Sequence, residues 1–206
     1  LGIIPERLVN CALVHGIHME KVGKADCGRG AQDFTSAIPA CDGLYTNEKN
    51  VPLGLNYADC TPLLFYDPVT SSIAVAHGGW RGTAGNIAGE AVRHLQESYG
   101  AEPKNIKAGI GPAIGKSVFE VEKDVVEAFE KIFDEEEMKR LSAPKGEGKI
   151  LIDLPLANRI LMERAGILPE NIEDCGICTY CRNDLFYSYR KAAGRTGRHM
   201  AVMMLK

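Results

Sequence analysis

The sequence lacks a long apolar run and a surplus of charge of either sign. No apolar stretch approaches the roughly 18 residues that a membrane-spanning helix needs, and residues 1–10 do not resemble a secretory signal. The 24 basic and 27 acidic residues give a net charge of −3 and are interspersed, which is no electrostatic footprint for nucleic acid. We therefore expect a soluble protein with no membrane or nucleic-acid partner, and a small neutral or anionic ligand fits this composition.

A disulfide framework and a linker are also missing. The seven cysteines are an odd number in a chain of 206 residues, which is long enough to fold without disulfides, so reduced thiols in the cytoplasm are expected. The 22 glycines and 10 prolines are spread along the chain, and we predict one catalytic domain over residues 1–206. Because the chain opens with Leu1 rather than methionine, an upstream segment is compatible with the sequence.

Hydrophobic periodicity predicts strands and helices in alternation. We expect a β-hairpin, with its turn at Asp67-Pro68, and a helix from Gly85 that Gly100 closes; Asp153 is expected to cap a further helix that Gly166 ends. The expected strands are 10–14, 62–66, 72–77, 149–152, 172–177 and 200–205, and residues 186–190 are expected to be a further extended segment. Another helix is expected over 122–133. The acidic run 134–137 is interpreted as a solvated turn. These elements predict an α+β fold, with a mixed β-sheet or β-sandwich core flanked by helices.

The segment 58–86 has the highest density of residues that can carry chemistry. Inside this segment, four glycines fall in a stretch of eight residues, and the single tryptophan, Trp80, is followed by Arg81. Glycines allow close approach of the backbone to a ligand, and an arginine can bind phosphate with two parallel hydrogen bonds. The alternative is a plain connection between a strand and a helix.

Cys60 and His77 lie at opposite ends of the predicted hairpin sequence, so the two side chains are expected at the same end of adjacent strands. They are a possible pair of metal ligands, although a buried small cysteine and a hydrogen-bonded histidine are equally consistent with the sequence. His15 and His18 both follow the first predicted strand, and spacing does not choose between them as a third ligand.

A second cysteine cluster, Cys175-x-x-Cys178-x-x-Cys181, lies near the C-terminus. Three thiolates at this spacing can bind zinc or an iron–sulfur cluster, but the fourth cysteine and the proline that usually follows are absent. Reduced thiols at the end of a strand are the favoured interpretation.

The chain resembles the YfiH/YlmD family, whose members carry the label multicopper polyphenol oxidoreductase or laccase-domain protein. The motifs that carry this resemblance occur in family order and span essentially the whole chain: Val14-His15-Gly16, Ala58-Asp59-Cys60-Thr61-Pro62-Leu63, Ala76-His77-Gly78-Gly79-Trp80-Arg81-Gly82-Thr83, Gly109-Ile110-Gly111-Pro112-Ala113-Ile114-Gly115 and Thr196-Gly197-Arg198. The resemblance implies that His15, Cys60 and His77 hold one zinc ion, which selects His15 over His18.

The resemblance also implies an activity. Family members catalyse phosphorolysis of adenosine, inosine and guanosine, cleavage of methylthioadenosine and deamination of adenosine. Three protein ligands with an open fourth position are typical of catalytic zinc, and such an ion can activate water for attack on adenine. We expect purine nucleosides and phosphate as substrates and assign Cys60, His77 and Arg81 as catalytic candidates, with Arg81 and the glycine-rich loop orienting the phosphate.

Three features depart from the family pattern. The glutamine that precedes the first ligand is replaced by Leu13, and the usual cysteine pair after the Gly-Pro loop is replaced by Ser117-Val118. The N-terminal block of the family, which contributes an Arg-Gly-Gly-type segment to the substrate pocket, has no counterpart before Leu1 in this sequence. The first two departures do not affect the three metal-ligand positions, whereas the third concerns phosphate binding.

Three other functions compete with this interpretation, and one of them is a non-enzymatic binding module, which is favoured only if the N-terminal block is absent from the protein. Two histidines and a cysteine are also the ligand set of blue copper, and copper can substitute for zinc, which allows a polyphenol oxidase. A multicopper oxidase needs on the order of ten histidines, whereas the chain has five. Cys60 and His77 could instead form the nucleophile and base of a metal-free cysteine hydrolase, in which a third converging ligand has no role.

Overall fold

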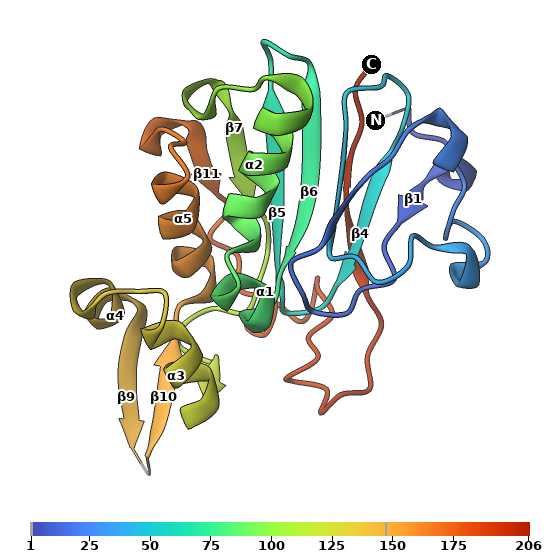
Figure 1. The fold of residues 1–206 in the computed structure, drawn as a ribbon. Helices are drawn as coiled ribbons and strands as arrows, with labels where there is room; N and C mark the ends of the chain where they lie inside the picture. Colours follow the sequence, from blue (N-terminus) through green and yellow to red (C-terminus); the bar gives the residue numbers. More distant parts are fainter. Residues whose placement is uncertain (1, 147) are drawn as a thin grey trace.

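The computed structural model describes residues 2–146 and 148–206 (Figure 1). Its helices are α1 (Trp80–Ala84), α2 (Ile87–Tyr99), α3 (Lys123–Glu130), α4 (Glu135–Leu141) and α5 (Leu154–Arg164). Its strands are β1 (Val9–Asn10), β2 (Met19–Lys21), β3 (Gly43–Thr46), β4 (Leu53–Tyr57), β5 (Thr61–Asp67), β6 (Ser72–Gly78), β7 (Lys107–Ile110), β8 (Glu120–Val121), β9 (Ser142–Gly146), β10 (Lys149–Ile152), β11 (Ile172–Asp174) and β12 (His199–Met203).

A mixed sheet with the strand order β11-β7-β5-β6-β3-β2 forms the centre of the molecule. The predicted hairpin is its middle: β5 and β6 pair antiparallel, from Thr61 opposite Gly78 to Asp67 opposite Ser72. The pairs β11–β7 and β2–β3 are parallel, whereas the other pairs of this sheet are antiparallel. The α+β class and the mixed sheet predicted from the sequence are confirmed.

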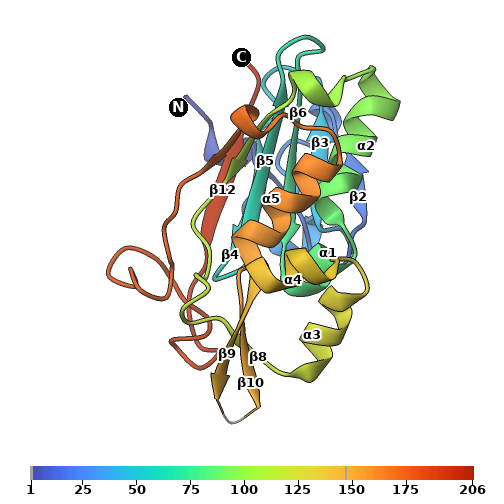
Figure 2. The ribbon, with the colours of Figure 1, turned by 90° about the vertical axis from the view of Figure 1, so that its left-hand side faces the viewer.

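The central sheet is covered on both faces, as Figure 2 shows. Helices α2 and α5 cover one face, and a small sheet with the order β1-β4-β12 packs on the other. Because side chains alternate along a strand, Ala74 and Ala76 of β6 pack in the helix-side core while Ile73 and Val75 pack against the small sheet. The same alternation directs His77 toward the small-sheet side.

A third sheet, β8-β10-β9, extends from one end of the molecule together with α3 and α4 (Figure 1). Strand β10 pairs antiparallel with both of its neighbours, and the predicted strand 149–152 is confirmed. Among residues 2–146 and 148–206, none of the helices has the length and the hydrophobicity of a membrane-spanning segment.

Two helix boundaries were predicted correctly from their caps. Helix α2 ends at Gly100, whose φ of 73° is a left-handed conformation that glycine adopts without strain. The Asp153 side chain accepts a hydrogen bond from the backbone N–H of Leu156, which makes it the N-cap of α5. Gly166, beyond the end of α5, has a φ of 94°.

The prediction for residues 122–137 was wrong in two respects. Helix α3 ends at Glu130, so the expected helix 122–133 is shorter. The acidic run is not a turn: Asp134 caps α4, its carboxylate accepts from the N–H of Glu137, and the Glu137 carboxylate accepts from the N–H of Asp134. This reciprocal capping box stabilises a helix whose first turn is acidic, as the helix dipole favours.

Other segments also differ from the prediction. Residues 186–190 form bends and turns rather than an extended piece, because their polar groups bond to Asp59 instead of to a strand. The strand expected over 10–14 is limited to β1 and a bridge at Cys11, and the strand expected over 172–177 ends at Asp174. Part of the glycine-rich loop is the short helix α1.

Candidate metal centre

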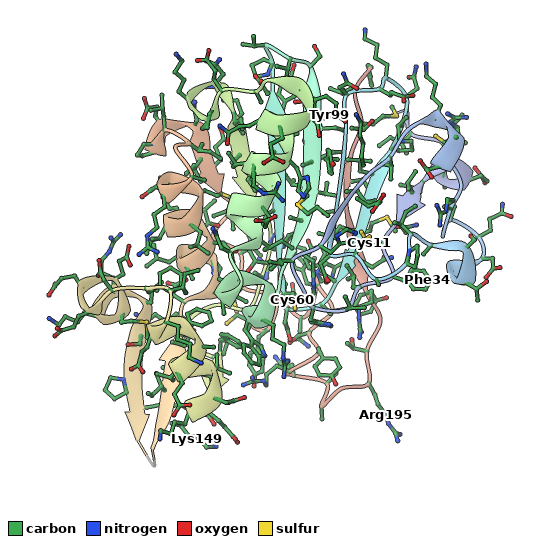
Figure 3. The ribbon with its side chains drawn as sticks, in the orientation of Figure 1. Cys11, Phe34, Cys60, Tyr99, Lys149 and Arg195 are labelled. Atoms are coloured by element: carbon green, nitrogen blue, oxygen red, sulfur yellow. The ribbon has the colours of Figure 1, made fainter. Side chains whose placement is uncertain are left out.

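His15, Cys60 and His77 converge at one end of the two packed sheets. Cys60 immediately precedes β5, His77 lies near the end of β6, and His15 is in the loop after β1. One ligand atom from each of the three residues lies within 4.8 Å of the others, and the two imidazole rings meet edge to face with 4.9 Å between centroids. Figure 3 shows Cys60 beside α1. Exposure falls from His15, which is exposed, through Cys60 to His77, which is buried.

Gly79 packs directly against all three side chains. A Cβ atom at this position would lie 3.2 Å from Cys60 Sγ and 3.4 Å from a ring carbon of His15 and of His77. Its φ of −70° is ordinary, so the requirement for glycine here is close approach rather than an unusual backbone conformation. This explains one of the glycines that the sequence placed in the loop.

The donor set fits a zinc ion. Zinc binds imidazole nitrogen at about 2.0–2.1 Å and thiolate at about 2.3 Å in tetrahedral geometry, so bound donors are about 3.5 Å apart. The 4.8 Å limit on the separations of the three atoms therefore leaves only a small contraction on binding. Two nitrogens and one sulfur also suit copper, so the donor set alone does not distinguish the two ions.

Asp42, which the sequence analysis did not single out, orients both histidines. Its buried carboxylate accepts hydrogen bonds from the backbone N–H groups of His15, at 2.8 Å, and Gly16, at 2.7 Å. Its Oδ1 atom also lies 3.3 Å from Nδ1 of His77, which leaves Nε2 of that ring as the nitrogen available to a metal. In the sequence, Asp42-Gly43 resembles an ordinary turn, so no local signal indicates this role.

The side chains of Cys60, His77 and Asp42 shift one another's pKa values. Burial raises the pKa of the Cys60 thiol, but hydrogen bonds with His15 and His77 outweigh burial and lower it to about 6. Burial lowers the pKa of His77, but hydrogen bonds with Asp42 and Cys60 raise it to about 9. Burial likewise raises the pKa of Asp42, and hydrogen bonds with His77 and the Gly16 backbone lower it below its usual value. Cys60 is therefore a thiolate at neutral pH, which is the form that binds metals.

The three residues open into a cavity of about 470 Å³. This volume lies within the range of about 300–1,000 Å³ that is typical of small-molecule sites. The walls combine apolar and aromatic residues with two arginines: Leu13, Tyr57, Trp80, Ile114, Phe119, Tyr189, Arg190 and Arg198. The arrangement can hold a flat, partly apolar ligand and an anion next to the candidate metal centre.

Asp59 fixes the segment that closes this cavity. Its buried carboxylate accepts hydrogen bonds from the hydroxyls of Thr179, at 2.6 Å, and Ser188, at 3.0 Å, and from the backbone N–H of Arg190, at 2.7 Å. The adjacent residue is Cys60, so one short stretch contributes both a candidate ligand and the anchor of the distant wall. The sequence motif contained Asp59 but did not indicate this second function.

Arg81 does not line the cavity of the candidate metal centre. Its guanidinium stacks on Trp80, 4.0 Å from the ring centroid, and borders a neighbouring cavity of about 390 Å³. Trp80, Phe119 and Arg190 line both cavities. The arginines that line the cavity of the candidate metal centre are Arg190 and Arg198, whose guanidinium groups also donate to backbone carbonyls, of Glu120 and of Thr196 and Gly197 respectively. Neither was assigned a role from the sequence.

Two alternatives from the sequence are not supported by this geometry. His18 is exposed and pairs with Glu20 at 3.1 Å, away from the converging ligands. Across the described residues, Cys175, Cys178 and Cys181 do not form a converging set of metal-ligand atoms, whereas His15, Cys60 and His77 do. The three C-terminal thiols are free.

The fold and the site define an α+β protein with a candidate centre of two histidines and one cysteine. The chain belongs to the family described as multi-copper polyphenol oxidoreductase laccase, whose model matches residues 1–206. This confirms the family resemblance noted in the sequence.

Similar proteins include a purine nucleoside phosphorylase YlmD from Geobacillus stearothermophilus, which is 42% identical over 200 residues, covering 96% of this chain and 72% of the relative. An adenosine deaminase RL5 from an unknown prokaryotic organism is 32% identical over 198 residues, covering 96% of this chain and 75% of the relative. The crystal structure of the hypothetical protein YfiH from Bacillus licheniformis superposes with a TM-score of 0.96 at 37% identity, covering 100% of this chain and 76% of that one.

Proposed function

We propose that the chain is a zinc-dependent purine nucleoside phosphorylase acting on adenosine, inosine and guanosine, with adenosine deaminase and methylthioadenosine phosphorylase side activities. The observation that carries the proposal is the convergence of His15, Cys60 and His77 on a cavity that also holds Arg190 and Arg198. The names of the similar proteins, a phosphorylase and a deaminase, support it. We further propose a single catalytic domain located in the cytoplasm, where seven free thiols stay reduced.

His15, Cys60 and His77 would hold the zinc ion, and Asp42 would keep His77 in the correct tautomer. Zinc supplies Lewis-acid chemistry when bound, because three protein ligands leave one coordination position for water or substrate. The Cys60 thiolate contributes the negative charge of the ligand set. Gly79 leaves the space in which the three side chains meet.

The two arginines of the cavity are the anion-binding groups of this proposal. Phosphorolysis forms a bond from a phosphate oxygen to ribose C1′ and breaks the bond from C1′ to the purine, so phosphate must lie beside the ribose. Arginine binds phosphate in a bidentate manner and stays charged at all physiological pH values. Arg190 is held over Phe119 and Arg198 over Tyr189, at 5.5 and 5.6 Å from the ring centroids. Arg81 borders the adjoining cavity, whose wall also contains Glu120, Glu122 and Asp124, so its part in this proposal is limited to the stacking contact with Trp80.

The aromatic walls of the cavity suit a purine. The cavity wall includes the flat aromatic rings of Trp80, Phe119 and Tyr189. A purine ring can stack against such rings, and the contact stabilises the bound ligand. Leu13 and Ile114 complete the apolar lining, so a ligand with one aromatic end and one polar end is accommodated.

The test is release of hypoxanthine from inosine by zinc-loaded protein, with and without phosphate. We expect release only when phosphate is present, because phosphate is the attacking group. His77→Gln should abolish release, and His18→Gln, on an exposed histidine of the same loop region, is the matched control that should retain it. Equal release without phosphate would exclude a phosphorylase in favour of a nucleoside hydrolase.

Deamination is tested separately, because it needs no phosphate. Adenosine should become inosine in phosphate-free buffer with the zinc-loaded protein, since a bound zinc ion would supply Lewis-acid chemistry for this hydrolysis and water is the second substrate. His77→Gln should lose this activity together with phosphorolysis. Loss of one activity alone would show that the two reactions do not share the site.

A further inference from the structure

The C-terminal cysteine cluster contains a thiol pair that the proposed function does not use. Cys178 and Cys181 are separated by two residues in a hydrogen-bonded turn, in which the backbone N–H of Arg182 donates to the carbonyl of Cys178 at 2.9 Å. The backbone N–H of Cys181 donates to Cys178 Sγ at 3.3 Å, so the Cys178 side chain turns toward Cys181. This spacing allows the short Cα separation that a disulfide requires.

The position of Cys178 is fixed by the neighbouring loop. A backbone bridge joins Cys178 to Ala113, and the backbone N–H of Gly115 donates to Cys178 Sγ at 3.3 Å. A Cβ atom at Gly115 would lie 3.3 Å from this sulfur, so glycine provides the space that the thiol occupies. Thr179, between the two cysteines, is buried and bonded to Asp59. The turn is therefore preorganised, with one sulfur that accepts two backbone N–H groups.

The two thiols are electronically different. Burial raises the pKa of Cys178, but the Cys181 thiol and backbone N–H groups donate hydrogen bonds that together lower it below its usual value. The hydrogen bond with Cys178 raises the pKa of Cys181, which is exposed. A thiol with a lowered pKa beside an exposed thiol is the arrangement found in reactive Cys-x-x-Cys pairs.

We propose that Cys178 and Cys181 form a peroxide-sensitive modification site that closes reversibly into a disulfide. The Cys178 thiolate attacks an oxygen of hydrogen peroxide, the O–O bond breaks, and the products are a sulfenic acid on Cys178 and one water after protonation. The Cys181 sulfur then attacks the Cys178 sulfur, the S–O bond breaks, and the second water leaves with the thiol proton of Cys181. Two electrons pass from the two thiols to the peroxide. A small thiol reductant reverses the reaction by thiol–disulfide exchange.

The test uses the zinc-loaded full chain carrying Cys175→Ser, because one tryptic peptide, residues 165–182, otherwise contains three cysteines. After brief treatment with hydrogen peroxide, free thiols are alkylated and the peptide is measured by mass spectrometry. We expect the peptide to lose both alkyl labels together and to be lighter than the reduced peptide by two hydrogens. Dithiothreitol should restore both labels. Retention of both labels would overturn the proposal, as would loss that dithiothreitol does not reverse.

Two single variants in the same background test the order of the steps. Cys181→Ser removes the resolving thiol, so dimedone should trap a sulfenic acid on Cys178. Cys178→Ser removes the nucleophile, so Cys181 should keep its label. Sulfenic acid on Cys181 instead of Cys178 would overturn the assignment of roles. Zinc content is measured before and after oxidation with wild-type protein, and release of a zinc ion from the three C-terminal cysteines would show a metal site rather than a redox pair.

Discussion

Asp42 is the residue on which the geometry of both histidines depends. Its carboxylate accepts from the backbone of His15 and contacts the ring of His77, and it is fully buried. Outer carboxylates of this kind orient the ligand and raise its basicity, and their loss typically weakens metal binding by about 10–100-fold. Asp42 is thus as much part of the candidate site as the ligands themselves.

We predict that Asp42→Asn lowers the zinc affinity of the protein by about 10–100-fold. The amide keeps one oxygen acceptor but turns an N–H₂ donor toward backbone N–H donors and removes the charge that favours the metal-bound site. Competition with a chromophoric chelator measures the affinity. Glu20→Gln is the control, since Glu20 pairs with the exposed His18 and should leave the affinity unchanged. Wild-type affinity in Asp42→Asn would contradict the assigned role.

Cys60 and Cys178 provide a second comparison between single residues. We predict that Cys60→Ala abolishes turnover and zinc binding, because it removes the one anionic ligand, while the protein stays folded since this side chain is outside both hydrophobic cores. Cys178→Ala should retain most of the activity of the reduced protein. Nucleoside phosphorolysis, zinc content and the midpoint of thermal unfolding are measured on both variants. Equal loss of activity in the two, with normal zinc in each, would refute the metal-ligand assignment.

At the scale of elements, the sequence predicted best where hydrophobic periodicity and caps agree. Helix α2 combines a regular apolar face with a left-handed glycine at its end, and its C-terminal end was recognised, whereas its start is Ile87 rather than the expected Gly85. Helix α4 was missed because its first turn, Glu135–Glu137, is acidic and carries no apolar side chain, so only the cap identifies it. Helix α1 has five residues, one of them the central Gly82, and such a short element leaves no periodic pattern to read.

The capping box of α4 can be tested by stability. We predict that Asp134→Ala lowers the free energy of unfolding by about 0.5–2 kcal/mol, because it leaves the N–H of Glu137 without its acceptor. Glu136→Ala is the matched control: this exposed side chain pairs with Lys139, and its loss should cost less than about 0.5 kcal/mol. Urea unfolding of both variants gives the two values. A change no larger for Asp134→Ala than for the control would exclude a stabilising capping box.

At the scale of the whole molecule, the candidate site exists because packed layers bring distant segments together. His15, Cys60 and His77 come from three separate stretches, and Arg190 is held there by a bond to Asp59 that spans 131 residues. The hairpin predicted from the sequence explains how Cys60 and His77 come close, since strand pairing is a local property. The third position was chosen by family resemblance, and Asp42, Arg190 and Arg198 were not recognised because only the packing of the layers places them at the cavity.

The distribution of histidines over the molecule bears on the oxidase alternative. Of the five in the chain, His15 and His77 are at the candidate centre, His18 pairs with Glu20, and His94 stacks on Tyr45 with 4.8 Å between centroids. The fifth, His199, packs edge to face on Tyr57 at 4.1 Å. Within residues 2–146 and 148–206 no second cluster of histidines is formed. A trinuclear copper centre, which needs many imidazoles in one place, cannot be built from one such chain.

We therefore predict that the protein, stripped of metal and reloaded with zinc alone, releases hypoxanthine from inosine in phosphate buffer but does not oxidise a phenolic substrate. Zinc has no accessible redox change, so any oxidation by this preparation would have to come from the protein. Copper ranks above zinc in affinity for nitrogen and sulfur ligands, so a copper-loaded sample can oxidise phenols in proportion to the copper bound at this single site. Cys60→Ala is the control, because it should lose copper-dependent oxidation and zinc-dependent phosphorolysis together. Phenol oxidation that persists with zinc alone, or that Cys60→Ala retains in full, would refute the assignment and direct attention to the C-terminal thiols.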